Sequence, residues 1–162
     1  MELSRVAVAS PVGTWGVEGD GDGVTRVYMP NEPFAATASS ASPVRDAASQ
    51  LAEYFAGRRR AFDIALGRVA TTDFRRRVWA ALAAIPYGEV RSYGQVATAV
   101  GDPRAARAVG NANHANPWPI VIPCHRVVAS NGLGGFGGGL DVKRYLLDLE
   151  GVALGAVAHR VR

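Results

Sequence analysis

The stretch Ile122-Pro123-Cys124-His125-Arg126-Val127 carries the only cysteine of a 162-residue sequence. It directly follows the apolar run 118–122, which is rich in β-branched residues and bounded by prolines. That composition predicts a short buried strand over 118–122, with the thiol at its end. A single cysteine cannot form a disulfide within the chain, so Cys124 is either a nucleophile or an inert core residue.

A catalytic thiol needs a nearby base or positive charge that favours the thiolate. His125 follows Cys124 directly, and their side chains can meet only if the chain turns here, because adjacent side chains of a strand point to opposite faces. The imidazole needs a partner that fixes its tautomer, and Glu150 is a better-placed candidate than Asp148 or Glu89. The competing interpretation is a structural cysteine beside a hydrogen-bonded histidine, which suits most isolated cysteines.

Composition narrows the class of protein. No apolar stretch approaches the roughly 20 residues needed to span a bilayer, and the first residues lack the pattern of a secretory signal. With a single cysteine, these features predict a cytoplasmic protein. The net charge of +4 is compatible with a polyanionic partner but is common in other proteins too.

Residues 1–70 predict an N-terminal α/β domain. Three alternating segments with glycine-containing turns between them, at 5–9, 14–18 and 24–28, predict an antiparallel meander. Apolar positions from 44 to 57 follow helical spacing, which predicts a helix. The alternation over 62–66 predicts a further strand, and the composition of 35–42 predicts a surface loop.

Residues 71–151 predict a C-terminal domain made mainly of helices. Thr72 or Asp73 can cap its first helix, and a last amphipathic helix is predicted over 141–150. A glycine-dense loop precedes that helix. Residues 152–162 have little pattern and are predicted to form a C-terminal tail.

Two short helices in the middle of this domain predict a helix-turn-helix. Ser92 can cap the first, and the second runs from about 104 to 114 after a tight turn. The second helix carries small residues beside Arg104 and Arg107, which favours sequence-tolerant contact with a minor groove over base reading by long side chains. Two helices packed tightly through alanines, with Arg107 in a salt bridge or on a phosphate, remain an open interpretation.

Six blocks keep a fixed order across residues 73–151: Ile85-Pro86-Tyr87-Gly88-Glu89-Val90, Ser92-Tyr93, Ala105-Ala106-Arg107-Ala108-Val109-Gly110, Asn116-Pro117, Ile122-Pro123-Cys124-His125-Arg126-Val127 and Gly138-Gly139-Leu140. Together they resemble the C-terminal domain of O6-alkylguanine-DNA alkyltransferases (methylated-DNA–protein-cysteine methyltransferases). The first third of the chain resembles the family's N-terminal domain, without a specific motif.

The resemblance implies an α/β (α+β) fold, in which a ribonuclease-H-like N-terminal meander and helix join a winged-helix-like helix-turn-helix domain. It implies direct-reversal DNA repair, in which O6-alkylguanine is flipped from double-stranded DNA through the minor groove. The alkyl group passes irreversibly and stoichiometrically to the protein's cysteine. Flipping is required because stacking shields the reacting carbon. O4-alkylthymine is a second candidate lesion; a monomer is expected, and no cofactor, metal or membrane is implied.

The resemblance also implies catalytic roles. Cys124 matches the nucleophile, His125 a base that acts through a water, and Glu150 the residue that orients the histidine. Tyr93 matches the donor of a proton to the departing guanine. Asn116 matches the asparagine that braces the turn between the recognition helix and the active-site segment.

Two further sets follow from the same resemblance. The DNA-binding set comprises Arg107, a finger that fills the vacated space, with Arg104, Ala105, Ala106, Ala108, Gly110 and Ser92. The substrate-pocket set comprises Val127, Phe136, Gly137, Asn113 and Pro119. The carbonyls of Cys124 and Val127 are expected to accept from the guanine amine, and the Gly137 amide to face O6. Arg126 is expected to form a structural ion pair.

Some residues depart from the family's pattern. Phe136 stands where many members carry tyrosine, so a wall of the pocket is kept and a hydroxyl is lost. Asn111 and His114 occupy positions that are often glycine and arginine, and Asn113 a position that is apolar in some members. The zinc site that some members hold in the N-terminal domain cannot be built here in its thiolate form, because no cysteine besides Cys124 is present.

Three other functions fit less of the sequence. A non-catalytic alkyltransferase-like protein carries tryptophan in place of Cys124. A sequence-specific regulator is opposed by the alanine-rich surface of the second helix. A cysteine–histidine hydrolase needs an oxyanion hole and a substrate cleft, and neither is visible in the sequence.

Overall fold

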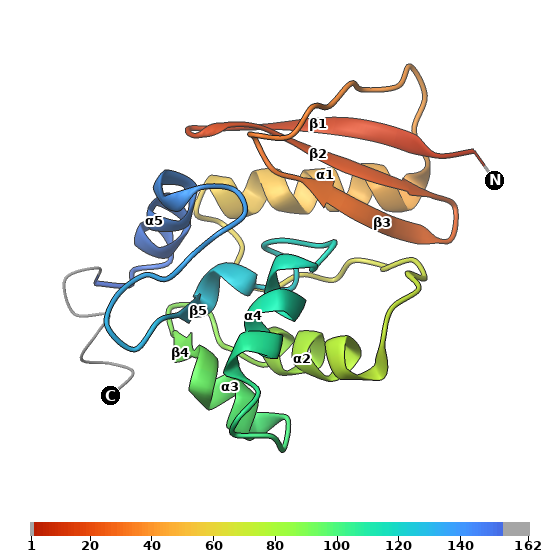
Figure 1. Cartoon of the computed structure of the whole chain (residues 1–162). Helices are drawn as coiled ribbons and strands as arrows, with labels where there is room; N and C mark the ends of the chain where they lie inside the picture. The colour runs from red at the N-terminus through yellow and green to blue at the C-terminus, as the bar shows by residue number, and fades with distance from the viewer. Residues whose placement is uncertain (1, 154–162) are drawn as a thin grey trace. The chain divides into compact units, whose positions relative to one another are not determined.

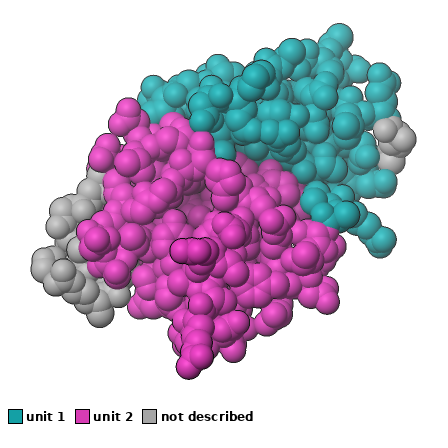
Figure 2. Space-filling model, viewed as in Figure 1, with its two compact units in different colours: residues 1–70 teal, residues 71–162 magenta. Residues whose placement is uncertain are grey.

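The computed structural model describes residues 2–153 and separates into two compact units, residues 1–70 and 71–162 (Figure 2). The predicted mixed α/β fold is confirmed: the first unit combines a sheet with a helix, and the second consists mainly of helices. No helix within residues 2–153 has the length and apolarity needed to cross a membrane.

The first unit is a three-stranded antiparallel sheet covered by one helix (Figure 1). Strands β1 (Ser4–Ser10), β2 (Gly13–Asp20) and β3 (Gly23–Tyr28) follow one another in the sheet as they do in the chain. Helix α1 (Ser42–Phe55) packs against β1 and β2 through its apolar stripe. The fully buried residues of this layer include Trp15, Val17, Val44, Leu51 and Tyr54.

The strand predicted over 62–66 is wrong. This segment touches the sheet at one position only, the parallel bridge between Val24 and Leu66. Two backbone hydrogen bonds, from the Val24 amide to the Ala65 carbonyl and from the Gly67 amide to the Val24 carbonyl, make that bridge. The alternating pattern reflects a chain that lies along the sheet without extending its ladder.

Residues 71–153 of the second unit contain four α-helices: α2 (Asp73–Ala83), α3 (Tyr93–Ala99), α4 (Ala106–His114) and α5 (Leu140–Leu149). Thr72 caps α2 by accepting from the Arg75 amide. Ser92 and Gln95 form a reciprocal capping box at the start of α3, which explains why this short helix begins there. The predicted helix-turn-helix is therefore present as α3 and α4, although Arg104 and Ala105 precede α4 instead of lying within it.

A short parallel ladder fixes the segment after Cys124 next to the start of α3. Strand β4 (Arg91–Ser92) pairs with β5 (Val127–Val128). Behind it, Val90, Val128, Leu147 and Val152 form one buried apolar cluster. Val152 thus belongs to this core, while the rest of the predicted tail from 154 onward lies outside the described residues.

The strand predicted over 118–122 is also wrong, although the run is buried as expected. It forms a turn, closed by a 2.8 Å hydrogen bond from the Ile122 amide to the Trp118 carbonyl. Ile120 has φ of 73°, a left-handed conformation that no strand contains. Prolines at 117, 119 and 123 remove the donors that a ladder requires, so burial here comes from packing and not from sheet pairing.

Candidate active site

Cys124 opens a single 3₁₀ turn, η1 (Cys124–Arg126), and its side chain is buried with 5% exposed. The amide of Cys124 donates to the Ile122 carbonyl at 2.8 Å. This turn replaces the extended chain in which neighbouring side chains diverge. The backbone therefore turns at Cys124, which contact between the side chains of Cys124 and His125 would require.

Two asparagines brace this turn from the side of α4. Asn116 donates from Nδ2 to the Ile122 carbonyl at 2.7 Å and accepts from the Trp118 amide at 3.0 Å, so it ties the chain after α4 to the turn before Cys124. Asn113 donates to the Cys124 carbonyl at 3.2 Å, while its buried Oδ1 has no partner among the described residues.

Trp79 of α2 contacts both α4 and the apolar run before Cys124. Its indole nitrogen donates to the Ala112 carbonyl at 2.8 Å, and its ring lies edge-on to Trp118 with ring centroids 5.8 Å apart. The apolar run before Cys124 is thus packed against the helix-turn-helix. A rigid support of this kind holds a nucleophile in place more precisely than a free loop does.

A buried network joins His125, Arg126 and Glu150. The carboxylate of Glu150 accepts from His125 Nε2 at 2.7 Å and from Arg126 Nε and Nη2 at 2.7 and 3.0 Å. Arg126 Nη1 donates to the Ile85 carbonyl at 2.7 Å. Glu150 is thus the carboxylate that meets His125, whereas Asp148 and Glu89 are exposed.

This network fixes the protonation of His125. Burial lowers the pKa of the imidazole more than the neighbouring Glu150 raises it, so the ring is neutral at pH 7. Because Nε2 faces the carboxylate, it carries the proton, and Nδ1 is left as an acceptor. Nδ1 is buried and has no partner among the described residues.

The surroundings of Glu150 and Cys124 shift the pKa values of these two groups in opposite directions. Burial opposes ionisation of Glu150, but its hydrogen bond to His125 and the charge of Arg126 outweigh it and hold the pKa well below the usual range. Burial raises the pKa of the Cys124 thiol, while Asn116 and the charge of Lys143 act against that rise. The resting thiol is therefore protonated at neutral pH and needs a base to react.

Tyr93, the first residue of α3, faces the glycine-rich loop. Its hydroxyl lies 3.5 Å from the Gly135 carbonyl, at the outer limit of a hydrogen bond. Gly134 has φ of 72°, and a Cβ there would lie 3.1 Å from the Tyr93 ring, so a glycine is required for this approach. Burial, and then the charge of Cys124, raise the pKa of Tyr93, which keeps the phenol protonated as a donor.

The substrate-pocket residues predicted from the sequence differ in exposure. Val127 and Pro119 are buried, as is Asn113, whereas Phe136 is half-buried and Gly137 exposed. The two carbonyls expected to accept from the guanine amine already each accept from a side chain, Cys124 from Asn113 and Val127 from Lys143.

The predicted DNA-binding residues lie on or just before α4. Arg107 and Ala108 are exposed, together with Asn111 and His114, while the opposite side of the helix is buried. Arg107 makes no hydrogen bond or ion pair with any described residue. The remaining members are Arg104, which is exposed, Ala105, Ala106 and Gly110, which are half-buried, and Ser92, which is buried with its hydroxyl in the α3 cap.

Lys143 is the site residue that the sequence analysis missed. It lies in α5 and is fully buried, with Nζ donating to the carbonyls of Val127 at 2.7 Å and Gly135 at 3.1 Å. A lysine is almost never fully buried, so the helical pattern gave no reason to place it inside. The available signal was its identity as the only lysine among 18 basic residues.

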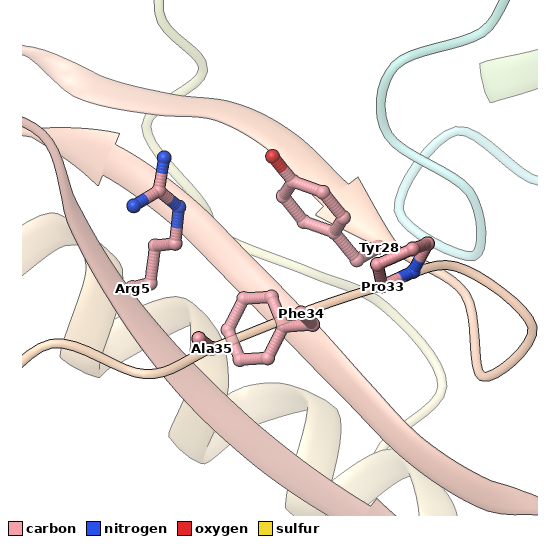
Figure 3. A pocket seen from close by; sticks show the side chains of 5 residues that line it. All are labelled: Arg5, Tyr28, Pro33, Phe34 and Ala35. Carbon is pink, nitrogen blue, oxygen red and sulfur yellow. The ribbon is translucent and has the colours of Figure 1, made fainter.

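A separate hollow of about 400 Å³ lies in the first unit (Figure 3), lined by Arg5, Tyr28, Pro33, Phe34 and Ala35. Glu18 engages both polar side chains, Arg5 at 2.7 Å and the Tyr28 hydroxyl at 2.9 Å. The lining offers neither a nucleophile nor a base. Within residues 2–153 no cluster of three His, Cys, Asp or Glu side chains is placed to hold a metal ion.

Comparison with known sequences extends over most of the chain. Residues 73–152 match the family described as 6-O-methylguanine DNA methyltransferase, DNA binding domain. A methylated-DNA–protein-cysteine methyltransferase of Methanosarcina acetivorans is 42% identical, covering 88% of this chain and 94% of the relative. The protein of that name from Mycobacterium bovis is 45% identical, covering 88% and 89%.

Solved structures show the same similarity. The O6-methylguanine methyltransferase of Mycobacterium tuberculosis matches with a TM-score of 0.81 at 40% identity, covering 99% of this chain and 96% of the other. The structure of OGT from the same organism in complex with DNA matches with a TM-score of 0.79 at 43% identity, covering 91% of this chain and 92% of the other.

Proposed function

This chain belongs to the 6-O-methylguanine DNA methyltransferase family, and from that premise we propose that Cys124 is its alkyl acceptor. The protein repairs DNA directly, by moving an alkyl group from the O6 atom of a damaged guanine to a cysteine of its own chain. Cys124 is the only cysteine in the sequence. Its buried position beside a neutral histidine is the observation that carries the assignment.

His125 is the base for the thiol. Glu150 holds Nε2, so Nδ1, which has no partner among the described residues, is the ring atom able to take the Cys124 proton. The proton passes through a water, as the resemblance to the family implies. The imidazolium that forms is stabilised by the Glu150 carboxylate, which remains ionised because Arg126 also pairs with it. Asn116 holds the turn before Cys124 in a fixed position relative to the end of α4.

The thiolate sulfur attacks the alkyl carbon, so that an S–C bond forms as the C–O6 bond breaks. The electron pair of the broken bond stays with guanine, which becomes a better leaving group when it receives a proton. Tyr93 donates that proton from its hydroxyl. The proton that His125 took from Cys124 then replaces the one that Tyr93 has lost, so the protein gains and loses no proton overall. The products are a thioether on Cys124 and an unmodified guanine.

The exposed side of α4 is the surface that meets DNA. Ala108 and the half-buried small residues beside it allow the backbone to approach closely, which suits a narrow minor groove, and Arg104, which lies just before the helix, supplies a charge for the phosphates. Arg107 is exposed and has no hydrogen bond or ion pair with the part of the chain that the structure describes, and it enters the space that the flipped nucleotide leaves. Ala105, Ala106, Ala108 and Gly110 complete the contact, and Ser92 serves it by fixing the start of α3.

The flipped guanine occupies a pocket between η1 and the glycine-rich loop. Val127 and Pro119 line its buried part, Phe136 forms a wall, and the Gly137 amide faces O6. Because Asn113 and Lys143 already donate to the two carbonyls assigned to the guanine amine, each carbonyl must accept through its second lone pair.

Each molecule reacts once, since a thioether has no route back to a thiol in this site. We also place the protein in the cytoplasm, where the reducing environment keeps the single thiol available.

The test is an adduct measurement with an O6-methylguanine duplex. Mass spectrometry should find one added methyl group on the Cys124 peptide and none elsewhere, and Cys124→Ala should bind the duplex without forming an adduct. An adduct on another residue, or regeneration of free protein with multiple turnovers, contradicts the proposal.

A further inference from the structure

The exposed side of α4 carries a polar stripe among its small residues. Arg107, Asn111 and His114 are spaced four and three residues apart, so they lie on one side of the helix, and all three are exposed. Asn111 is the middle member of this stripe. Its side chain makes no hydrogen bond with any described residue, so no contact in residues 2–153 accounts for its amide group.

Asparagine lowers the stability of a helix at such a position. It is a weaker helix former than alanine, because its side chain competes for backbone hydrogen bonds. Its neighbours Gly110 and Ala112 carry no polar side-chain atom, whereas its own carboxamide both donates and accepts. The surface that faces DNA in the proposed function therefore presents a free carboxamide between two basic residues.

The stripe places Asn111 close to the damaged base pair. This step rests on the proposed function, in which Arg107 enters the space of the flipped nucleotide. Four residues of an α-helix advance about 6 Å, and DNA rises about 3.4 Å per base pair. Asn111 therefore meets the minor groove within about two base pairs of the flipped nucleotide.

Base pairs differ in the minor groove by a single donor. Every pair offers acceptors there, and only a G·C pair adds the exocyclic amine of guanine. The amide nitrogen of asparagine donates to a groove acceptor while Oδ1 accepts from that amine, so a G·C pair gains one hydrogen bond over an A·T pair. Alanine or glycine at this position makes no such distinction.

We propose that Asn111 is a specificity-determining residue, which makes repair of O6-alkylguanine faster where a G·C pair lies within about two base pairs of the lesion. The contact is with the guanine amine of that neighbouring pair. The rest of the surface stays tolerant of sequence, since its other side chains are small or bind phosphates, and phosphates carry no sequence information directly. The bond changes at Cys124 are unaffected.

Hypoxanthine isolates the amine, because its pair with cytosine is a G·C pair that lacks only this group. Two duplexes carry the same O6-methylguanine, and their two neighbouring pairs on each side contain either guanine or hypoxanthine. The ratio of single-turnover repair rates, guanine over hypoxanthine, should be about five- to tenfold higher for wild type than for Asn111→Ala. Comparing the two proteins cancels the different flipping cost of the two duplexes. Equal ratios overturn the inference.

Arg104→Ala is the matched control, because it removes an exposed side chain that the proposed function assigns to phosphates. Repair of both duplexes should slow, and the ratio should keep its wild-type value. A ratio that falls as far as in Asn111→Ala contradicts a role for the carboxamide. Alanine at 111 preserves the helix, since the position is exposed and alanine is the better helix former.

Equilibrium binding separates this outcome from a failure of the proposed function. With Cys124→Ala as the starting protein, Kd should favour the guanine duplex by the same factor, and adding Asn111→Ala should remove the preference. A preference that survives Asn111→Ala overturns the inference even if adducts map to Cys124. A preference that depends on Asn111, together with no adduct on Cys124 in the wild type, supports the inference and contradicts the proposed acceptor.

Discussion

Glu150→Gln tests the centre of the buried network. The carboxylate accepts three hydrogen bonds, one from His125 Nε2 and two from Arg126. Glutamine keeps one acceptor oxygen and replaces the other with an amide group that donates. Whichever way that amide turns, a donor of His125 or Arg126 meets another donor inside the protein, and the charge of Arg126 loses its partner.

Breaking a buried ion pair by removing one partner costs about 3–5 kcal/mol, since the remaining charge stays buried. For a chain of this length, that corresponds to a fall in melting temperature of roughly 6–20 °C at pH 7. Calorimetry measures it. Asp148→Asn is the matched control, because it removes a carboxylate near the same helix end that is exposed, and its melting temperature should change by less than about 2 °C.

The pH dependence carries the sign of the effect. The folded-state pKa of Glu150 lies below the ordinary 4.5, so its stabilisation is fully present above about pH 4.5 and is lost as pH falls through the folded value. The gap between wild type and Glu150→Gln should narrow below pH 4.5. Equal melting temperatures at pH 7, or a gap that stays constant down to pH 3, refute the reasoning.

Three further outcomes are expected. Arg107→Ala should slow repair of an alkylated duplex more than transfer from free O6-benzylguanine in single-turnover assays, because an inserted side chain matters only to a stacked base; equal losses oppose the finger role. Ser92→Ala removes the hydroxyl that caps α3 at Gln95 and should cost about 1 kcal/mol in urea unfolding. Trp79→Phe leaves the Ala112 carbonyl without its donor and should cost about 1–3 kcal/mol by the same assay; unchanged midpoints contradict both estimates.

The helices could be predicted where a local signal sets their ends. Thr72 and Ser92 cap α2 and α3 through side-chain oxygens at the positions that the sequence indicated. The two failed strands, 62–66 and 118–122, lack such signals. Alternation and β-branched content describe how a segment packs, and they do not say whether a partner strand is available to complete a ladder.

The site residues that could be named from the sequence were those whose side-chain type itself indicates a chemical role. Glu150 could be favoured because it ends a helix whose apolar side faces the core. Lys143 could not be placed in the site from the sequence, because its two partners are carbonyls of segments whose paths no local pattern specifies. The partners of Asn113 and Arg126 likewise depend on how distant segments meet.

The order of these residues along the chain has a consequence for biosynthesis. Cys124 leaves the ribosome before α5, which brings both Lys143 and Glu150, and Glu150 follows His125 by 25 residues. A nascent chain therefore presents an ordinary thiol, with no fixed imidazole and no buried ammonium beside it. The imidazole proposed to take the Cys124 proton is therefore oriented only after the last helix has formed.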